Sequence, residues 1–219
     1  TVFAIPSPTI ASNSPVCLGG ILNFTASGGS NFNWTGPNGF TSTLTTPSIP
    51  NVQLPAGGVY TLMAGTGNCT ATSMATIIIN PLPVVTATNT SPVCENQAFN
   101  LSGGGAQVYT WLGPNAYAAN GQNQLIANAT LSHTGVYTVT GTDANSCVNT
   151  ATTSVVINAL PIITANNPTV CVGGNIALNG NGAATYTWTG PNNFSSNLQN
   201  PNIPNATPQM GGLYTLIGT

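Results

Sequence analysis

Apolar and polar residues alternate in short segments along the chain, as in β-strands that bury one face. Apolar residues follow each of three cysteines at the fifth and seventh positions: Leu22 and Phe24, Phe99 and Leu101, Ile176 and Leu178. Further along each segment, an aromatic residue stands two positions before a tryptophan. This spacing places both rings on one face of a strand. No segment shows a sustained helical period. The pattern predicts an all-β protein.

The same residues recur with a period of 77. The period relates three residue types across the chain: Cys17, Cys94 and Cys171; Trp34, Trp111 and Trp188; Tyr60, Tyr137 and Tyr214. Gly-Pro-Asn follows each tryptophan, and Gly-x-Tyr-Thr surrounds each tyrosine. Proline fixes φ, and Gly and Asn tolerate the backbone of a tight turn. The chain therefore consists of tandem β-sandwich units.

We place the boundaries of the repeats at the proline-containing joints, which gives units at 6–80, 81–158 and 159–219. The third unit stops before any counterpart of the β-branched closing strands predicted at 71–79 and 150–157. Residues 1–5 resemble the end of such a strand. We expect a window on a longer array. The alternative is a polymer in which residues 1–5 of one chain complete the third repeat of a neighbour by strand addition.

Charge is nearly absent, with no Lys or Arg, two acidic residues and one histidine among 219 residues. Ser, Thr, Asn and Gln make up 84 residues and supply the polar surface instead. Without cations the chain cannot neutralise phosphates, so we exclude nucleic acid and anionic membrane surfaces as partners. No apolar run is long enough for membrane insertion. We expect stability to change little between about pH 3 and 9.

The candidate chemistry is sparse. The two carboxylates, Glu95 and Asp143, do not recur in the other units, and we predict no catalytic residues, cofactor or metal site. The three tryptophans and the three tyrosines of the repeat are predicted core residues. Aromatic residues that follow the Gly-Pro-Asn turn are the best candidates for contact with a ligand or a neighbouring subunit: Phe40, Tyr117 and Phe194.

The motif Pro-Val-Cys, Phe/Tyr-x-Trp-x-Gly-Pro-Asn and Gly-x-Tyr-Thr resembles the Ig-like (PKD-like) repeats of long secreted proteins of Bacteroidota. These include gliding-motility-type adhesins and other type IX-secreted surface proteins. The resemblance implies tandem Ig-like β-sandwich domains in a linear array, located outside the cell or on its surface. Such repeats mostly serve as spacers.

Five cysteines imply disulfides and an oxidising compartment. The spacing favours Cys17–Cys69 and Cys94–Cys147 within the units, which leaves Cys171 over. In an immunoglobulin-like topology, however, the early strand and the late hairpin lie at opposite ends of the sandwich. A bridge between units, such as Cys17–Cys147, is therefore one alternative, and free thiols are the other.

These observations predict a non-catalytic structural segment of an extracellular filament or surface adhesin shaft, with self-association or neighbouring repeats as its partners. The alternative is a set of accessory repeats that bind surface polysaccharide.

Overall fold

The computed structural model describes residues 4–219 of the chain, so three residues of the predicted donated strand at 1–5 lie outside the described part. By their contacts, the residues divide into two compact units, 1–157 and 158–219. The first unit contains two hydrophobic clusters and the second contains one. The repeat boundaries at 80/81 and 158/159 stay predictions.

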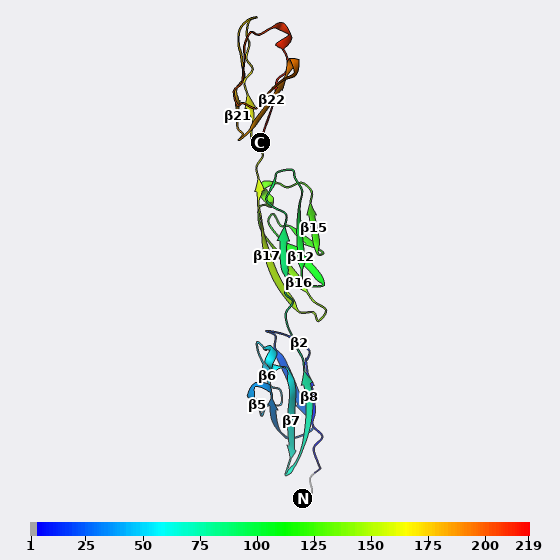
Figure 1. Cartoon of the computed structure of the whole chain (residues 1–219). Coiled ribbons are helices and arrows are strands. Elements are labelled where there is room, and N and C mark those ends of the chain that lie inside the picture. The colour runs from blue at the N-terminus through cyan, green and yellow to red at the C-terminus, as the bar shows by residue number, and fades with distance from the viewer. Residues whose placement is uncertain (1–3) are drawn as a thin grey trace. The chain divides into compact units, whose positions relative to one another are not determined.

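The first repeat is a sandwich of two antiparallel sheets (Figure 1). One sheet has the order β1 (Thr9–Ser12), β3 (Leu22–Ser27), β6 (Ser48–Ile49). The other has the order β5 (Phe40–Ser42), β4 (Asn31–Gly36), β7 (Gly58–Thr66), β8 (Cys69–Ile77). The short strands β2 (Val16–Cys17) and β9 (Ile79–Asn80) pair in parallel. Two 3-10 turns, η1 (Pro37–Gly39) and η2 (Leu54–Ala56), connect strands.

The second repeat has the same topology. One sheet has the order β10 (Thr86–Asn89), β12 (Phe99–Gly104), β15 (Asn123–Ile126). The other has the order β14 (Ala118–Asn120), β13 (Val108–Leu112), β16 (Gly135–Thr142), β17 (Val148–Val155). β11 (Val93–Cys94) pairs with β18 (Ile157–Asn158), and η3 (Leu131–His133) precedes β16.

The second unit contains the third repeat, whose larger sheet is one strand short. Its strand pairs are β19 (Thr164–Ala165) with β21 (Gly180–Asn181), and β20 (Ile176–Ala177) with β24 (Asn202–Ile203). The remaining sheet has the order β23 (Phe194–Ser196), β22 (Tyr186–Gly190), β25 (Thr215–Gly218), with η4 (Pro191–Asn193) and η5 (Pro208–Met210) nearby. Within residues 4–219, no strand pairs with the outer edge of β25 in the way that β8 pairs with β7.

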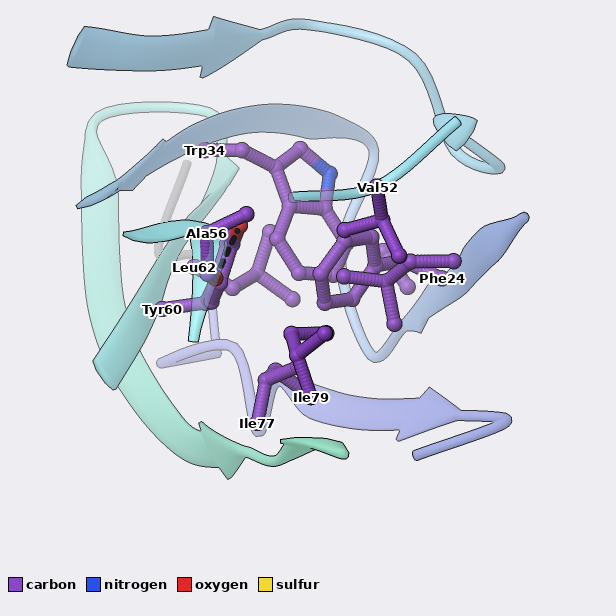
Figure 2. Packing of buried hydrophobic residues seen from close by; sticks show 10 residues of the cluster. Phe24, Trp34, Val52, Ala56, Tyr60, Leu62, Ile77 and Ile79 are labelled. Atoms are coloured by element: carbon purple, nitrogen blue, oxygen red, sulfur yellow. Dashed lines mark hydrogen bonds between the residues drawn. The ribbon is translucent and has the colours of Figure 1, made fainter. Parts of the chain in front are cut away.

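The core of the first repeat is built around Trp34, which is fully buried in the sandwich (Figure 2). The indole Nε1–H of Trp34 donates to the carbonyl of Leu44 at 2.9 Å, so its polar atom is satisfied. The Phe24 ring packs on both Trp34 and Tyr60, with centroid separations of 5.2 and 4.7 Å. The Tyr60 hydroxyl donates to the carbonyl of Ala56 at 2.9 Å.

A close contact between Gly36 and Tyr60 explains two parts of the repeated motif at once. A Cβ atom at Gly36 would lie 2.5 Å from Cδ1 of Tyr60, closer than any real side chain tolerates. The glycine therefore lets the tyrosine ring lie flat against the end of β4. The same clash would arise between Gly113 and Tyr137, and between Gly190 and Tyr214. The Gly-Pro-Asn turn and the Gly-x-Tyr-Thr strand thus depend on each other.

The buried tyrosines predict an alkaline loss of stability. Desolvation raises the pKa of Tyr60, Tyr117 and Tyr137 above the ordinary value of 10.0, and for Tyr137 the nearby Tyr117 adds to the rise. The unfolded chain then loses its phenolic protons before the folded one. The free energy of unfolding should be undiminished below about pH 10 and should fall as the pH rises through the raised pKa values.

Urea unfolding of the chain from pH 4 to pH 12 measures this dependence. The double variant Tyr60→Phe/Tyr137→Phe is the matched control, because it keeps both rings and should show a shallower alkaline decline. Equal alkaline declines for the two proteins, or a steep loss of stability near pH 5, would contradict the explanation.

Candidate functional sites: an inter-repeat disulfide and an open groove

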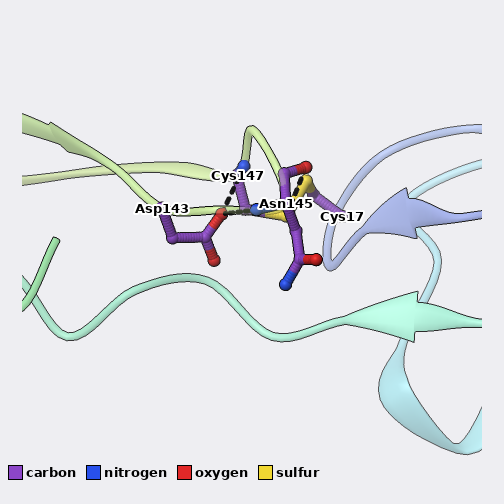
Figure 3. Close-up of a disulfide and its surroundings, with 4 residues drawn as sticks. All are labelled: Cys17, Asp143, Asn145 and Cys147. Carbon is purple, nitrogen blue, oxygen red and sulfur yellow. Dashed lines mark hydrogen bonds between the residues drawn. A yellow bond between two sulfur atoms is a disulfide. The ribbon is translucent and has the colours of Figure 1, made fainter. Parts of the chain in front are cut away.

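A disulfide joins the first and second repeats (Figure 3). Cys17 ends β2 of the first repeat, and Cys147 lies in the turn before β17 of the second. Their Cα atoms are 5.6 Å apart, a typical disulfide separation. The bond closes a loop between residues 130 positions apart in sequence, and this loop contains most of both sandwiches. The two repeats are therefore covalently connected at two places, by the peptide chain and by the sulfur atoms.

Asp143 organises the turn that presents Cys147. Its carboxylate oxygen Oδ1 accepts the backbone N–H groups of Asn145 at 2.8 Å and Cys147 at 2.9 Å (Figure 3). Such charge-assisted bonds to backbone donors are among the stronger hydrogen bonds in proteins. Ser146 adopts a φ of 63° in the same turn. One of the two acidic residues of the chain thus has a structural role.

The favoured pairing of Cys17 with Cys69 and Cys94 with Cys147 is wrong, and the alternative bridge between units is the observed one. Asn80 lies beside Cys17 in the parallel pair, whereas Cys69 begins β8 at its other end. At about 3.3 Å per residue, the run from residue 69 to residue 80 is roughly 35 Å long. A disulfide tolerates at most about 7 Å between Cα atoms.

Cys94 and Cys171 stand 77 and 154 positions after Cys17, at the equivalent places of the second and third repeats. Cys94 ends β11 and is exposed, and it forms no disulfide within residues 4–219. Cys171 is also exposed and lines the groove described next. Over the same residues, no three His, Cys, Asp or Glu side chains gather as a metal site would require.

The third repeat has an open groove of about 570 Å³, lined by residues 166–178 and 206–214. Its apolar lining comes from β20, from the adjacent segment and from the η5 region: Val170, Ile176, Leu178, Ala206, Met210 and Tyr214. A shift of 154 positions, two periods, relates five of these to residues of the first core: Leu22, Phe24, Val52, Ala56 and Tyr60. In that core, Ile77 and Ile79 belong to the same buried cluster as these five residues. The sequence predicts a third repeat without its last strand but did not lead us to these lining residues, although the 77-residue period relates them to core residues of the first repeat.

The predicted core and contact residues have the following surroundings. Trp34, Trp111, Tyr60 and Tyr137 are fully buried, Trp188 is nearly so, and Tyr214 is only half-buried. The rings that follow the Gly-Pro-Asn turns each pack edge-on against the tyrosine of their own repeat: Phe40 on Tyr60, Tyr117 on Tyr137, Phe194 on Tyr214. Each of these three rings is half-buried. Contact of these rings with a ligand or a neighbouring subunit stays a prediction.

The comparisons with known proteins concern the fold. No protein-family model matches the chain, and no curated protein matches its sequence. A solved structure of the titin I-band fragment I67–I69 is similar over 98% of this chain and 93% of that one, with 14% identity and a TM-score of 0.55. The fold is that of tandem immunoglobulin-like β-sandwich domains. The all-β, Ig-like prediction is thereby confirmed.

Two further structures align over nearly the whole chain. One is an E-to-A variant of titin domains I67–I69, with 15% identity, 97% of this chain and 93% of that chain covered, and a TM-score of 0.49. The other contains the three N-terminal domains of the outer capsid protein Hoc of bacteriophage RB49. It has 15% identity, coverages of 98% and 86%, and a TM-score of 0.40.

Removing the disulfide should destabilise the first unit. In the chain-entropy model, closing a loop of 130 residues stabilises the folded state by about 5 kcal/mol. The double variant Cys17→Ser/Cys147→Ser should therefore unfold at markedly lower urea concentration. Exposed Cys94 supplies the control, because Cys94→Ser should change stability by less than about 0.5 kcal/mol.

Non-reducing peptide mapping of the wild-type chain checks the pairing itself. A peptide pair that contains Cys17 and Cys147 is expected, and a pair that contains Cys94 and Cys147 would contradict the structure.

Proposed function

We propose that the chain is a non-catalytic structural segment of an extracellular filament or of a surface adhesin shaft. The observation that carries this proposal is the Cys17–Cys147 disulfide, which fastens one repeat to the next. Disulfides persist in oxidising surroundings, which supports a location outside the cell. Over residues 4–219, no helix is long and apolar enough to cross a membrane.

The position of the disulfide supports a load-bearing role. Tension applied through the two ends of the first unit passes from residue 17 to residue 147 through the sulfur atoms. The peptide between these residues, which includes β3 to β16, then carries none of that tension. A covalent bond thus protects most of both cores from mechanical unfolding.

The near absence of charge supports close lateral or end-to-end packing of such segments. With no Lys or Arg and only two carboxylates, neighbouring chains repel one another little at any pH or salt concentration. Amide and hydroxyl groups remain available for hydrogen bonds between chains. Head-to-tail assembly by strand complementation, with the third repeat as the acceptor, is part of this proposal.

Electron microscopy of the native material tests the function. Antibodies raised against this chain and labelled with gold should decorate filaments or stalks on the cell surface or shed from it. Labelling confined to the cell interior, or a diffuse secreted protein without filaments, would refute the proposal.

Single-molecule stretching tests the mechanical part. When the first unit of the wild-type chain unfolds, its gain in contour length should be shorter by roughly 450 Å than under reducing conditions, because about 3.5 Å per residue stays locked in the loop. The Cys17→Ser/Cys147→Ser variant should show the longer gain with or without reductant. Equal gains for oxidised and reduced wild type would exclude protection by the disulfide.

A further inference from the structure

The outer edge of β8 in the first repeat differs from the equivalent edge of β17 in the second. Each strand ends the larger sheet of its repeat, β8 beyond β7 and β17 beyond β16 (Figure 1). β8 has nine residues and β17 has eight, and neither contains a proline or a charged residue. A long, uncharged edge strand is a template for pairing with another chain, and natural proteins normally cover or interrupt such edges. The question is therefore how each of these two edges is covered.

Two asparagine side chains cover the edge of β17, and we call them the caps. Asn149 accepts the backbone N–H of Thr150 on its Oδ1 at 2.9 Å. Asn89, which ends β10, donates from its Nδ2 to the carbonyl of Ser154 at 2.9 Å and to the hydroxyl of Thr153 at 2.6 Å. In an antiparallel strand the backbone groups of alternate residues point to the same side, here away from β16. The caps thus occupy groups that a further strand would need.

Neither cap is present on β8. The register of the hairpins places Ala71 where the second repeat has Asn149, and the pairing of β1 and β10 places Ser12 where it has Asn89. Alanine has no polar side-chain atom. The Ser12 hydroxyl accepts the N–H of Ser14 at 3.4 Å and makes no hydrogen bond to β8 within residues 4–219.

The outward backbone groups of β8 are therefore open. Thr72 and Thr76 are the register equivalents of Thr150 and Ser154, so their N–H and C=O groups, and those of Met74 between them, point away from β7. Within residues 4–219, none of these groups has a hydrogen-bond partner on that side. The strand that carries the cap in the second repeat, β10, has its full counterpart in β1. The difference between the edges thus comes from the residues themselves.

Exposed apolar side chains lie beside the open edge. Met74 of β8 is 68% exposed, and Met63 and Val59 of the neighbouring β7 are 40% and 53% exposed on the same face of the sheet. The second repeat has threonine at the positions of both methionines, Thr140 and Thr152. Methionine adapts its shape to a partner and is common at binding surfaces. Two independent features, unpaired backbone groups and exposed methionines, thus coincide on the first repeat.

The sequence of β8 is suited to pairing with a second copy of itself. If two copies lie antiparallel with their Ser73 residues opposite each other, the outward backbone groups of one strand face those of the other. Every opposed pair is then small or uncharged: Thr72 with Met74, Thr70 with Thr76, Ala71 with Ala75. The absence of Lys and Arg and the presence of only two carboxylates let two copies meet without charge repulsion.

We propose that the edge of β8 from Thr70 to Thr76 is an interaction surface that pairs antiparallel with the same edge of a second copy of this chain. The two larger sheets become one continuous sheet about a two-fold axis at Ser73, which is an isologous contact. Met74 of each copy lies on the outer face of that sheet, next to Thr72 of the other. The inference rests on the proposed function in one respect, because it gives the lateral packing of such segments a defined contact.

Transfer of the caps tests the proposal. Sedimentation equilibrium of the 219-residue chain from micromolar to millimolar concentration should show dimers. The variant Ser12→Asn/Ala71→Asn gives β8 the two caps of β17 and should dimerise at least tenfold more weakly, with an undiminished melting temperature. The reverse variant, Asn89→Ser/Asn149→Ala, is the matched control. It changes the same two positions in the other repeat and should leave dimerisation at β8 intact.

A second variant keeps the test valid if the capped one folds poorly. Thr72→Pro removes one outward N–H and no hydrogen bond to β7, a place in an edge strand where proline is tolerated. It should also weaken dimerisation at least tenfold at an unchanged melting temperature. Full dimerisation of Thr72→Pro would contradict the pairing.

Cross-linking tests the register. Residues opposite each other in a non-hydrogen-bonded pair have Cα atoms about 4.5 Å apart, within reach of a disulfide. In a chain whose exposed thiols are removed by Cys94→Ser/Cys171→Ser, the further change Ser73→Cys should yield a covalent dimer on mild oxidation. Met74→Cys in the same background faces Thr72 of the second copy and should cross-link far less. Equal cross-linking of the two variants overturns the proposed register.

The other outcomes are distinct. A chain that stays monomeric, or associates equally with and without the caps, overturns the proposal. Equal association is the result that head-to-tail complementation alone would give, because the caps touch neither residues 1–5 nor the third repeat. Dimers through β8 together with gold labelling confined to the cell interior would retain this contact and refute the shaft. Labelled filaments formed by a chain that does not dimerise through β8 would retain the shaft and refute this contact.

Discussion

The burial of two side chains from the closing strand is the interaction on which each of the first two sandwiches depends. The chain has no Lys or Arg with which its two carboxylates could pair, so its cohesion comes mainly from apolar burial, hydrogen bonds and one disulfide. Ile77 and Ile79 of the closing strand are buried in the same cluster as Trp34, Tyr60 and the other core residues of the first repeat. Where no such strand is present, the buried cluster shrinks to Ile176, Leu178, Trp188 and Ala206.

The closing strand also explains the path of the disulfide. It carries the chain from the hairpin at one end of a sandwich to the parallel pair at the other. The hairpin of the second repeat thereby comes to the end of the first repeat where Cys17 lies. A disulfide can therefore join two consecutive repeats of this topology without a special connecting segment.

Most of the fold followed from the sequence, because the 77-residue period and the alternation of apolar residues are local signals. The disulfide did not, because gaps of 52 and 53 residues look like pairs within a unit and only the topology reveals that their members lie far apart. The lining of the groove was missed for a similar reason. Met210 and Val170 belong to no distinctive sequence pattern. Their position in the groove became clear only from the first repeat, where the equivalent Ala56 and Val16 are part of the core or pack against it.

The sulfur bridge between Cys17 and Cys147 turns this stretch of the chain into a closed ring. The proline-containing joint at residues 80–83 lies inside the ring, as does every loop between β3 and β16. A protease that cuts the backbone once at any of these places opens the ring but does not divide the molecule. The connection between the repeats is thus redundant, and severing it takes both a peptide cleavage and a reduction.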